Sequence, residues 1–226
     1  MTAYRLSATT QDDATICGQI GGTPHLPASG NWPRCRICAS DMIAFLDLVL
    51  PPCDSAPFQP GSRLQVFACR EHDDIAGTIY SDYSTFDSTS RQQKLPPQFW
   101  NITDGHYLLQ LLPPSARTSE SQQESRLIPQ LVSASPTEDD VEDGFKMYGE
   151  PFWLQDAEPH SCSCGAPTKL LLQIPDGHGF QMAHGAEPQP NSFSNAEYCI
   201  SLGNQLYLLG CSRQCDRLAL WPVLQN

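Results

Sequence analysis

The chain has 226 residues, of which 40% are hydrophobic and 17% are charged, a globular composition that is long enough to bury a core. Asp and Glu number 25 and Lys and Arg number 13, so the net charge is −12. This balance disfavours binding to nucleic-acid phosphates or to an anionic membrane, because both attract Lys and Arg. The same field favours basic partners, basic proteins among them.

The chain contains 20 prolines and 15 glycines, which leave little room for long helices and favour short strands joined by turns. No uncharged apolar run approaches the ~18 residues of a membrane-spanning helix. The first seven residues carry no apolar core of a signal peptide, so we expect a cytoplasmic protein with reduced thiols. In that compartment, the ten cysteines indicate metal ligands rather than disulfides.

One order of features occurs twice along the chain. Each copy has a Gly-x-Pro turn, a cysteine pair, an apolar run, a second apolar run and a second pair of ligand residues. The turns and runs lie at 22–24, 42–48 and 63–68 in the first copy, and at 149–151, 170–174 and 205–210 in the second. The offset is nearly constant, since 126 residues separate Cys38 from Cys164 and 127 separate Gly22 from Gly149. We therefore expect a mainly β fold of two duplicated antiparallel lobes, related by a pseudo-two-fold axis.

The first candidate metal site combines Cys35, Cys38, Cys69 and His72. A Cys-x2-Cys pair folds a tight knuckle in which two thiolates reach one ion, and a Cys-x2-His pair would supply the other two corners of a tetrahedron. Zinc suits sulfur and imidazole ligands, and four protein ligands make a structural site. The alternative is that these cysteines are small apolar core residues.

The second candidate zinc site combines Cys162, Cys164, Cys211 and Cys215. Its Cys-x-Cys and Cys-x3-Cys spacings are less usual, but the pairs stand where the first site's pairs stand in the repeat. His160 could replace one of the ligands. A redox dithiol formed by Cys162 and Cys164 is a further alternative.

Three cysteines, Cys17, Cys53 and Cys199, have no place in either set, and we expect them to pack as apolar residues. The sequence contains no Gly-x-Ser-x-Gly elbow, no His-Glu-x-x-His, no phosphate loop and no dinucleotide fingerprint. We therefore expect a protein that is not an enzyme. The alternative is a hydrolase or redox enzyme that uses the remaining Cys and His residues.

The segments between and after the repeated features predict two more strands and a linker. The run 107–112 predicts a strand, and 217–221 predicts a last strand. Residues 115–145 are rich in Ser, Gln, Pro and acidic residues, so we expect a linker or loop. The domain organisation then becomes a first β lobe over 1–114, this acidic linker, and a second β lobe over 146–226.

The acidic cluster in this segment is the candidate contact with a basic partner, and it comprises Glu138, Asp139, Asp140, Glu142 and Asp143. The alternative is a solvated loop that adds only solubility. The aromatic residues Trp100, Tyr148 and Trp153 are possible anchors of the same contact, because buried aromatics dominate binding hot spots.

Five short segments carry a resemblance to known families. They are Gly-Gly-Thr-Pro at 21–24, Asn-Trp-Pro at 31–33, the apolar run 43–48, Gly-Glu-Pro-Phe-Trp-Leu-Gln at 149–155, and Leu-Leu-Leu-Gln-Ile at 170–174. Together they resemble the bacterial YwqG-like family, although Asp47 stands where that family's first strand has Gln. The resemblance implies a duplicated β-rich fold and a role in immunity against bacterial toxins. The cysteine pairs are similar to those of the programmed-cell-death-two family, which implies a chaperone for a basic ribosomal protein.

These observations lead to one functional expectation. We predict a non-enzymatic, acidic, zinc-binding protein that binds and neutralises a basic protein. The first version is an immunity protein against a toxin domain. The alternative version is a chaperone for a basic ribosomal or nucleic-acid-binding protein.

Overall fold

The structure is a computed structural model that describes residues 2–10, 16–28, 30–73, 93–101, 105–137 and 144–226. Ten strands form one large sheet: β1 (Ala3–Thr9), β2 (Ile16–Ile20), β4 (Ile43–Val49), β5 (Arg63–Ala68), β7 (Tyr107–Leu112), β9 (Gln130–Thr137), β10 (Lys146–Met147), β12 (Thr168–Ile174), β15 (Gln205–Cys211) and β16 (Leu220–Gln225). Their order across the sheet is β16-β15-β12-β10-β1-β9-β2-β4-β5-β7, and each neighbouring pair is antiparallel.

The remaining elements are short. Three two-stranded pairs lie outside the large sheet, namely β3 (His25–Pro27) with β8 (Thr118–Glu120), β6 (Gln93–Lys94) with β11 (His160–Ser161), and β13 (Phe180–Gln181) with β14 (Glu197–Tyr198). The helices among the described residues are two three-residue 3-10 turns, η1 (Phe99–Asn101) and η2 (Ser201–Gly203). Within the described ranges, no helix has the length and apolar character needed to cross a membrane. The prediction of a mainly β fold is therefore confirmed.

The strand order of the large sheet is the same from either end, which confirms the internal duplication. From one edge inward the strands are β7, β5, β4, β2 and β9, and from the other they are β16, β15, β12, β10 and β1. In this order β7 corresponds to β16, β5 to β15, β4 to β12, β2 to β10 and β9 to β1. The pseudo-two-fold axis therefore passes between β1 and β9, at the middle of the sheet. The strands predicted at 42–48, 63–68, 170–174 and 205–210 are β4, β5, β12 and β15.

A shared irregularity shows that the duplication extends to the register of single residues. The pairing of β4 with β5 shifts between Ala44 and Leu46, which leaves Phe45 as the bulged residue. The pairing of β12 with β15 shifts between Leu170 and Leu172, which leaves Leu171. These two bulged residues are 126 residues apart, the offset found in the sequence, and both are fully buried. A bulge increases local twist, so both halves bend at the same place.

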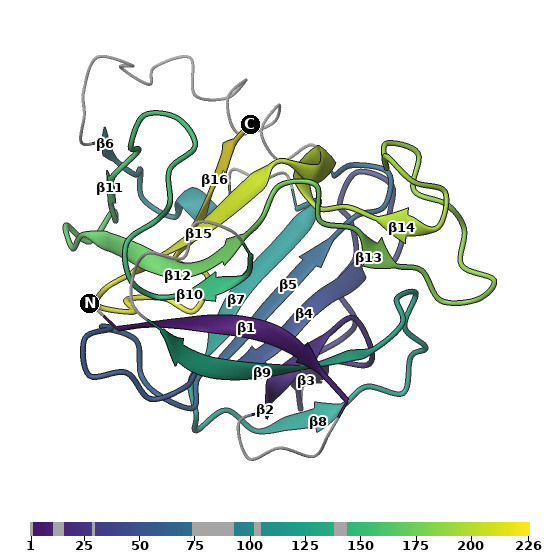
Figure 1. The fold of residues 1–226 in the computed structure, drawn as a ribbon, viewed down its shortest axis with the longest axis horizontal. Coiled ribbons are helices and arrows are strands. Elements are labelled where there is room, and N and C mark those ends of the chain that lie inside the picture. The colour runs from purple at the N-terminus through teal and green to yellow at the C-terminus, as the bar shows by residue number, and fades with distance from the viewer. Residues whose placement is uncertain (1, 11–15, 29, 74–92, 102–104, 138–143) are drawn as a thin grey trace.

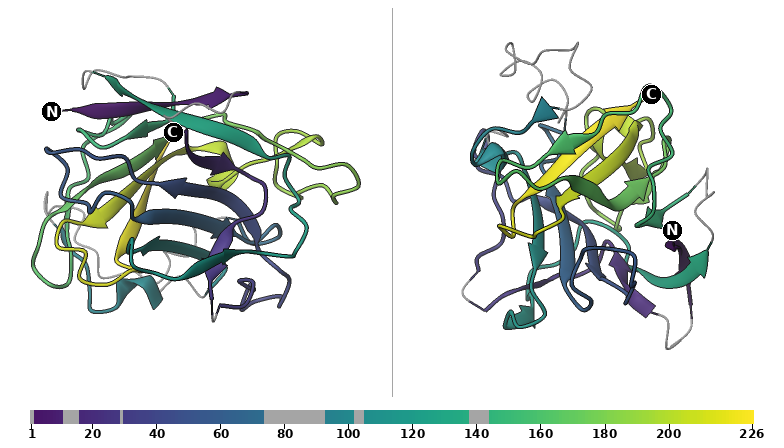
Figure 2. Two further views of the ribbon diagram at one scale, coloured as in Figure 1. Left: turned by 90° about the horizontal axis from the view of Figure 1, so that it is seen from below. Right: turned by 90° about the vertical axis from the view of Figure 1, so that its left-hand side faces the viewer.

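The core lies between the two halves of the curled sheet. Figure 1 shows β12, β15 and β16 lying across β4, β5 and β7, and Figure 2 shows the same arrangement from two other sides. The ring of Phe45 meets that of Phe180 at 4.9 Å, and Phe99 meets Trp221 at 5.6 Å. One apolar cluster contains residues of both halves. Burying this shared surface is the main force that holds the halves together.

The linker or loop predicted over 115–145 is wrong for the residues of this segment that the structure describes. Residues 118–120 form β8, and residues 130–137 form β9, which pairs with both β1 and β2 near the middle of the sheet. Its buried side chains are only Val132 and Ala134, and the rest of the strand consists of the exposed Leu131 with Gln, Ser, Pro and Thr. This strand exists because two neighbours supply hydrogen bonds, and its local composition gives no sign of that. The last strand is also shifted, from the predicted 217–221 to Leu220–Gln225.

Candidate metal centres

The first cluster brings together the four predicted residues Cys35, Cys38, Cys69 and His72. The first two lie on a turn closed by hydrogen bonds from the Cys35 N–H to the Ser40 carbonyl and from the Ala39 N–H to the Cys35 carbonyl, both 2.9 Å. The other two follow the end of β5 directly. All four ligand atoms lie within 4.8 Å of one another.

The distances within this cluster match a tetrahedral metal site. The sulfurs of Cys38 and Cys69 are 3.6 Å apart, and His72 Nδ1 lies 3.5 Å from the Cys69 sulfur and 3.7 Å from that of Cys35. A tetrahedron with metal–sulfur bonds of about 2.3 Å and metal–nitrogen bonds of about 2.0 Å has edges of about 3.8 Å between sulfurs and about 3.5 Å from sulfur to nitrogen. The separations also exceed the ~2.05 Å of a disulfide. The cluster can therefore hold a metal ion.

The second cluster brings together Cys162, Cys164, Cys211 and Cys215, again within 4.8 Å of one another. The sulfurs of Cys162 and Cys215 are 3.5 Å apart, as are those of Cys164 and Cys211. All ten cysteines of the chain are free thiols. The four cysteines predicted as the second site thus lie close enough together to hold one metal ion, in spite of their unusual spacing in the sequence.

The shorter Cys-x-Cys turn keeps the backbone geometry of the longer Cys-x2-Cys turn. In each knuckle the residue after the second cysteine has a positive φ, Ala39 at 60° and Gly165 at 84°. Gly165 adopts this left-handed conformation without strain, and Ala39 bears a steric cost that metal binding can offset. Ala39 and Gly165 are 126 residues apart, as are the second cysteines of the two turns. The one residue by which the Cys-x-Cys turn is shorter is therefore missing between its two cysteines.

Each cluster contains one exposed thiol that ionises easily and one buried thiol that does not. Hydrogen bonds from the Ser40 side chain and backbone lower the pKa of Cys38 to about 6, and the Ala166 backbone lowers that of Cys164 to about 7. Burial raises the pKa of Cys69 to about 12 and also raises that of Cys162. The three thiolates of the first cluster, or the four of the second, repel one another, so full ionisation of a cluster requires a cation at its centre.

The clusters also hold the two halves to each other. Asp73 follows the ligand His72, and its buried carboxylate accepts hydrogen bonds from Gln189 Nε2 at 2.7 Å and Asn191 Nδ2 at 3.2 Å. Both donors belong to the loop between β12 and β15, in the second half. The second knuckle, 211–215, makes the reciprocal contact with the loop between β4 and β5.

This reciprocal contact centres on Gln214, which lies next to the ligand Cys215. Its Oε1 accepts from the Gln59 N–H at 3.4 Å, and its Nε2 donates to the Pro57 carbonyl at 3.2 Å. Phe58 is buried between these two, and its ring lies against the backbone of Gly210. Each Cys/His or Cys cluster therefore lies beside a contact that positions a loop of the opposite half.

The other residues singled out in the sequence have varied positions. Cys17 and Cys199 are buried and Cys53 is half-buried, outside both clusters, as expected of packing residues. His160 is buried and is not among the second cluster's ligands.

Tyr148 is a wrong choice of anchor for a partner, because it is 2% exposed and its hydroxyl donates to the Pro51 carbonyl. Trp100 and Trp153 are half-buried. The acidic residues Glu138, Asp139, Asp140, Glu142 and Asp143 lie outside the described residues.

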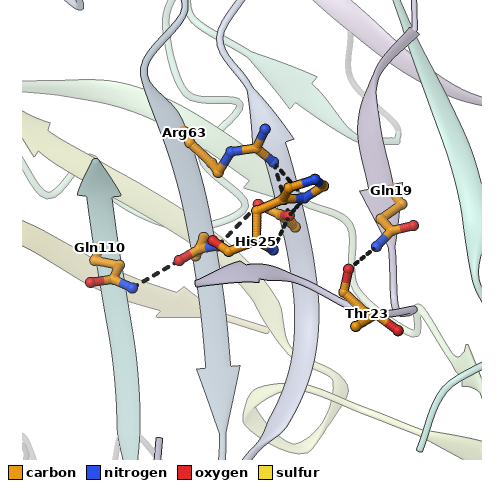
Figure 3. A network of polar contacts seen from close by, with 7 residues as sticks. Gln19, Thr23, His25, Arg63 and Gln110 are labelled. Carbon is orange, nitrogen blue, oxygen red and sulfur yellow. Dashed lines mark hydrogen bonds and ion pairs between the residues drawn. The ribbon is translucent and has the colours of Figure 1, made fainter. Parts of the chain in front are cut away.

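Sequence reasoning missed a polar network around Asp47, which is 2% exposed in the middle of β4. Its Oδ2 accepts from the His25 N–H at 2.9 Å and from Arg63 at 2.9 Å, and lies 3.0 Å from His25 Nδ1. Its Oδ1 accepts from Gln65 Nε2 at 3.1 Å, and that amide also donates to the His25 carbonyl. Figure 3 shows the side chains converging on His25, with Gln110 extending the network through its bond to Gln65.

This network fastens an extended segment, strap 1 (residues 21–27), to the face of the sheet. Gln19 holds the start of the strap by donating to the Thr23 carbonyl at 2.7 Å (Figure 3). Gly21 and Gly22 turn the chain with φ of 62° and 71°, values that a glycine adopts at little cost. The signal in the sequence that could have indicated this network is Asp47, which stands in an apolar run where the YwqG-like pattern has Gln. A carboxylate buried in a strand needs hydrogen-bond or charged partners.

The second half carries the same device, strap 2 (residues 148–154), made from different residues. Lys146 Nζ donates to the Glu150 carbonyl, as Gln19 does to Thr23, and both pairs are four residues apart. The Phe152 N–H donates to Gln173 Oε1 at 3.0 Å, and the Phe152 carbonyl accepts from the Tyr207 hydroxyl. Gln173 thus replaces Asp47, and Tyr207 replaces Gln65.

Comparison with protein-family models finds no match to the chain, and comparison with curated proteins finds none either. The resemblances to the YwqG-like and programmed-cell-death-two families therefore stay predictions from short motifs. The duplicated sheet and the paired Cys/His clusters rest on the structure itself.

Proposed function

We propose that the chain is a zinc-binding protein in which two structural zinc ions fix the second knuckles, 69–73 and 211–215. The main support for this proposal is that four sulfur or imidazole nitrogen atoms lie within 4.8 Å of one another in each half. One cluster offers three sulfurs and one imidazole nitrogen, and the other offers four sulfurs, both sets that zinc prefers. Four protein ligands leave no open position for a water or substrate, so the role is structural.

We further propose that the protein acts by binding a basic protein and not by catalysis. The net charge of −12 supports this, because it would speed association with a basic surface and disfavour anionic ligands. Several of the chemically active side chains have structural uses, which supports the same proposal. Seven cysteines and His72 belong to the clusters, and the His25 and Asp47 pair holds strap 1.

The partner we propose first is a toxin domain that the protein neutralises as an immunity protein. Support for this version comes from the short motifs shared with the YwqG-like family. The alternative is a chaperone for a basic ribosomal or nucleic-acid-binding protein, supported by the cysteine pairs. Both versions require an acidic protein and a basic client.

Capture followed by mass spectrometry tests the proposal and separates its two versions. The tagged protein would be expressed in its own cells and purified at low salt, with a salt wash as the elution step. The proposal expects one dominant basic protein that leaves the complex as salt rises. A toxin domain supports immunity, and a ribosomal or nucleic-acid-binding protein supports the chaperone. Capture of no basic protein would contradict both.

A further inference from the structure

The two straps differ in what covers their outer edges. Strap 1 contains β3, which pairs with β8 so that Leu26 stands opposite Ser119. The flanking bonds run from the Ser121 N–H to the Pro24 carbonyl at 3.1 Å and from the Ala28 N–H to the Arg117 carbonyl at 2.9 Å. The inner edge of the strap is therefore bonded to Asp47 and Gln65, and its outer edge is bonded to a strand of the same chain.

Strap 2 has the same inner edge, but no strand within the described ranges covers its outer edge. Phe152 is bonded on the inside to Gln173 and Tyr207, as His25 is to Asp47 and Gln65. Trp153 is the counterpart of Leu26, 127 residues later. Among the described residues no strand pairs with strap 2, and none bonds to the main-chain N–H or C=O of Trp153. The N–H of Gln155, the counterpart of Ala28, is bonded to Gln225 Oε1 at 3.0 Å. Within the described part of the chain, the position that matches the β8 pairing and has no partner is therefore the main chain of Trp153.

The side chains around this edge are apolar in the middle and mainly acidic at the ends. Phe152 is 37% exposed and Leu154 is 42% exposed, on either side of Trp153, whose ring rests on Tyr207 at 4.6 Å. Glu150 and Asp156 flank them and are exposed. Lys169 is a cation at this place, 4.0 Å from Glu150. An extended segment with Lys or Arg near its ends would match this pattern.

We propose that strap 2 binds a basic partner segment as an added β-strand, which pairs with Trp153 as Ser119 pairs with Leu26. The main chain of the partner gives and accepts hydrogen bonds at Trp153, and its alternate side chains pack on Phe152 and Leu154. Its basic residues lie near Glu150 and Asp156. This proposal rests on the proposed function, for which it supplies the contact surface.

The test uses isotope-labelled, zinc-loaded full-length protein and a short capped peptide that alternates Val and Thr between terminal Lys residues. Titration followed by NMR should shift the Trp153 amide resonance downfield and slow its hydrogen exchange. A peptide of the same sequence with methylated backbone nitrogens keeps charge and side chains but cannot donate to the strap. It should bind at least tenfold more weakly. Equal binding of both peptides would overturn strand addition.

Two matched variants locate the contact. Leu154→Lys places a repelling charge on the strap, and Leu202→Lys changes an equally exposed leucine, 43% exposed, outside it. The first should weaken the peptide at least tenfold and the second should leave it unchanged. Equal effects of both variants would overturn the assignment. Self-association of the parent protein that Leu154→Lys abolishes would overturn it too, because the strap would then bind a second copy of the chain.

Failure of this inference can be told apart from failure of the proposed function. If a captured basic protein binds the Leu154→Lys variant as tightly as the parent, the function stands and the strap is not the contact. If the parent captures no basic protein, the function fails whatever the peptide shows.

Discussion

Asp47 and Gln173 occupy equivalent positions 126 residues apart, and each accepts a hydrogen bond from the backbone N–H of a strap residue, His25 at 2.9 Å and Phe152 at 3.0 Å. Both side chains are buried. Asp47 carries a charge that Arg63 balances, whereas Gln173 performs the same task as a neutral amide. The duplicated halves have therefore kept the geometry and changed the electrostatics.

The Asp47→Ala substitution should destabilise the fold by about 2 to 3 kcal/mol. It leaves the His25 N–H without its acceptor and Arg63 without its counter-charge, and it removes one of the two acceptors of the Gln65 amide. The loss of a partner costs about 1 to 3 kcal/mol when the group is buried. Urea unfolding measures the difference. Asp54→Ala, at an exposed loop position, is the control and should change stability by less than about 0.5 kcal/mol. Equal effects of the two would show that Asp47 does not fasten the strap.

The Cys38→Ser substitution should remove one metal equivalent and leave the other in place. Cys38 is an exposed thiol, so the loss of a ligand affects metal binding more than packing. Cys53→Ser is the matched control, since Cys53 lies outside both clusters and should leave the metal content unchanged. Elemental analysis of the purified variants gives the count. A Cys38→Ser protein that retains full metal content would remove this residue from the site.

Loss of the first metal should loosen a loop far away in the sequence. In the Cys38→Ser variant, hydrogen exchange should rise in residues 187–199, which Asp73 holds through Gln189 and Asn191, and stay unchanged in residues 53–60. Cys164→Ser should produce the reverse pattern, because Gln214 holds the loop at 57–59. Exchange that rises only next to the mutated knuckle, in either variant, would contradict the reciprocal docking.

His178 should contribute to a loss of stability in mild acid. Its ring lies 4.6 Å from Phe145 and 4.7 Å from Phe180, and burial lowers its pKa. The folded-state pKa is the lower one, so the stability is present above the unfolded value of about 6.5 and falls as the pH drops below it. His178→Gln should flatten this part of the profile. The exposed His184→Gln serves as control, and a flattening as large in that variant would reject the assignment.

The sequence allowed the parts of the fold that depend on short-range patterns to be predicted. The apolar runs of β4, β5, β12 and β15 and the ligand pairs beside them recur at a constant offset, so both strands and clusters were predicted by residue. The periodicity of these runs reflects burial on the sheet, and the spacing of the ligands reflects the reach of a metal ion.

The parts that could not be predicted depend on distant partners. The strand β9 has a polar sequence and exists because β1 and β2 pair with it from both sides. The strap network joins His25, Asp47 and Gln65 across as many as 40 residues, and no local spacing indicates that contact. The reciprocal docking of Asp73 and Gln214 likewise requires the curled sheet, which sequence patterns do not specify.

Native mass spectrometry of the protein, purified without chelators under reducing conditions, tests the central claim most directly. The account predicts a folded chain that carries two zinc ions, one of which is lost in Cys38→Ser and the other in Cys164→Ser. A folded parent protein with no bound metal, and with all eight ligand side chains free to react with thiol or imidazole reagents, would contradict it.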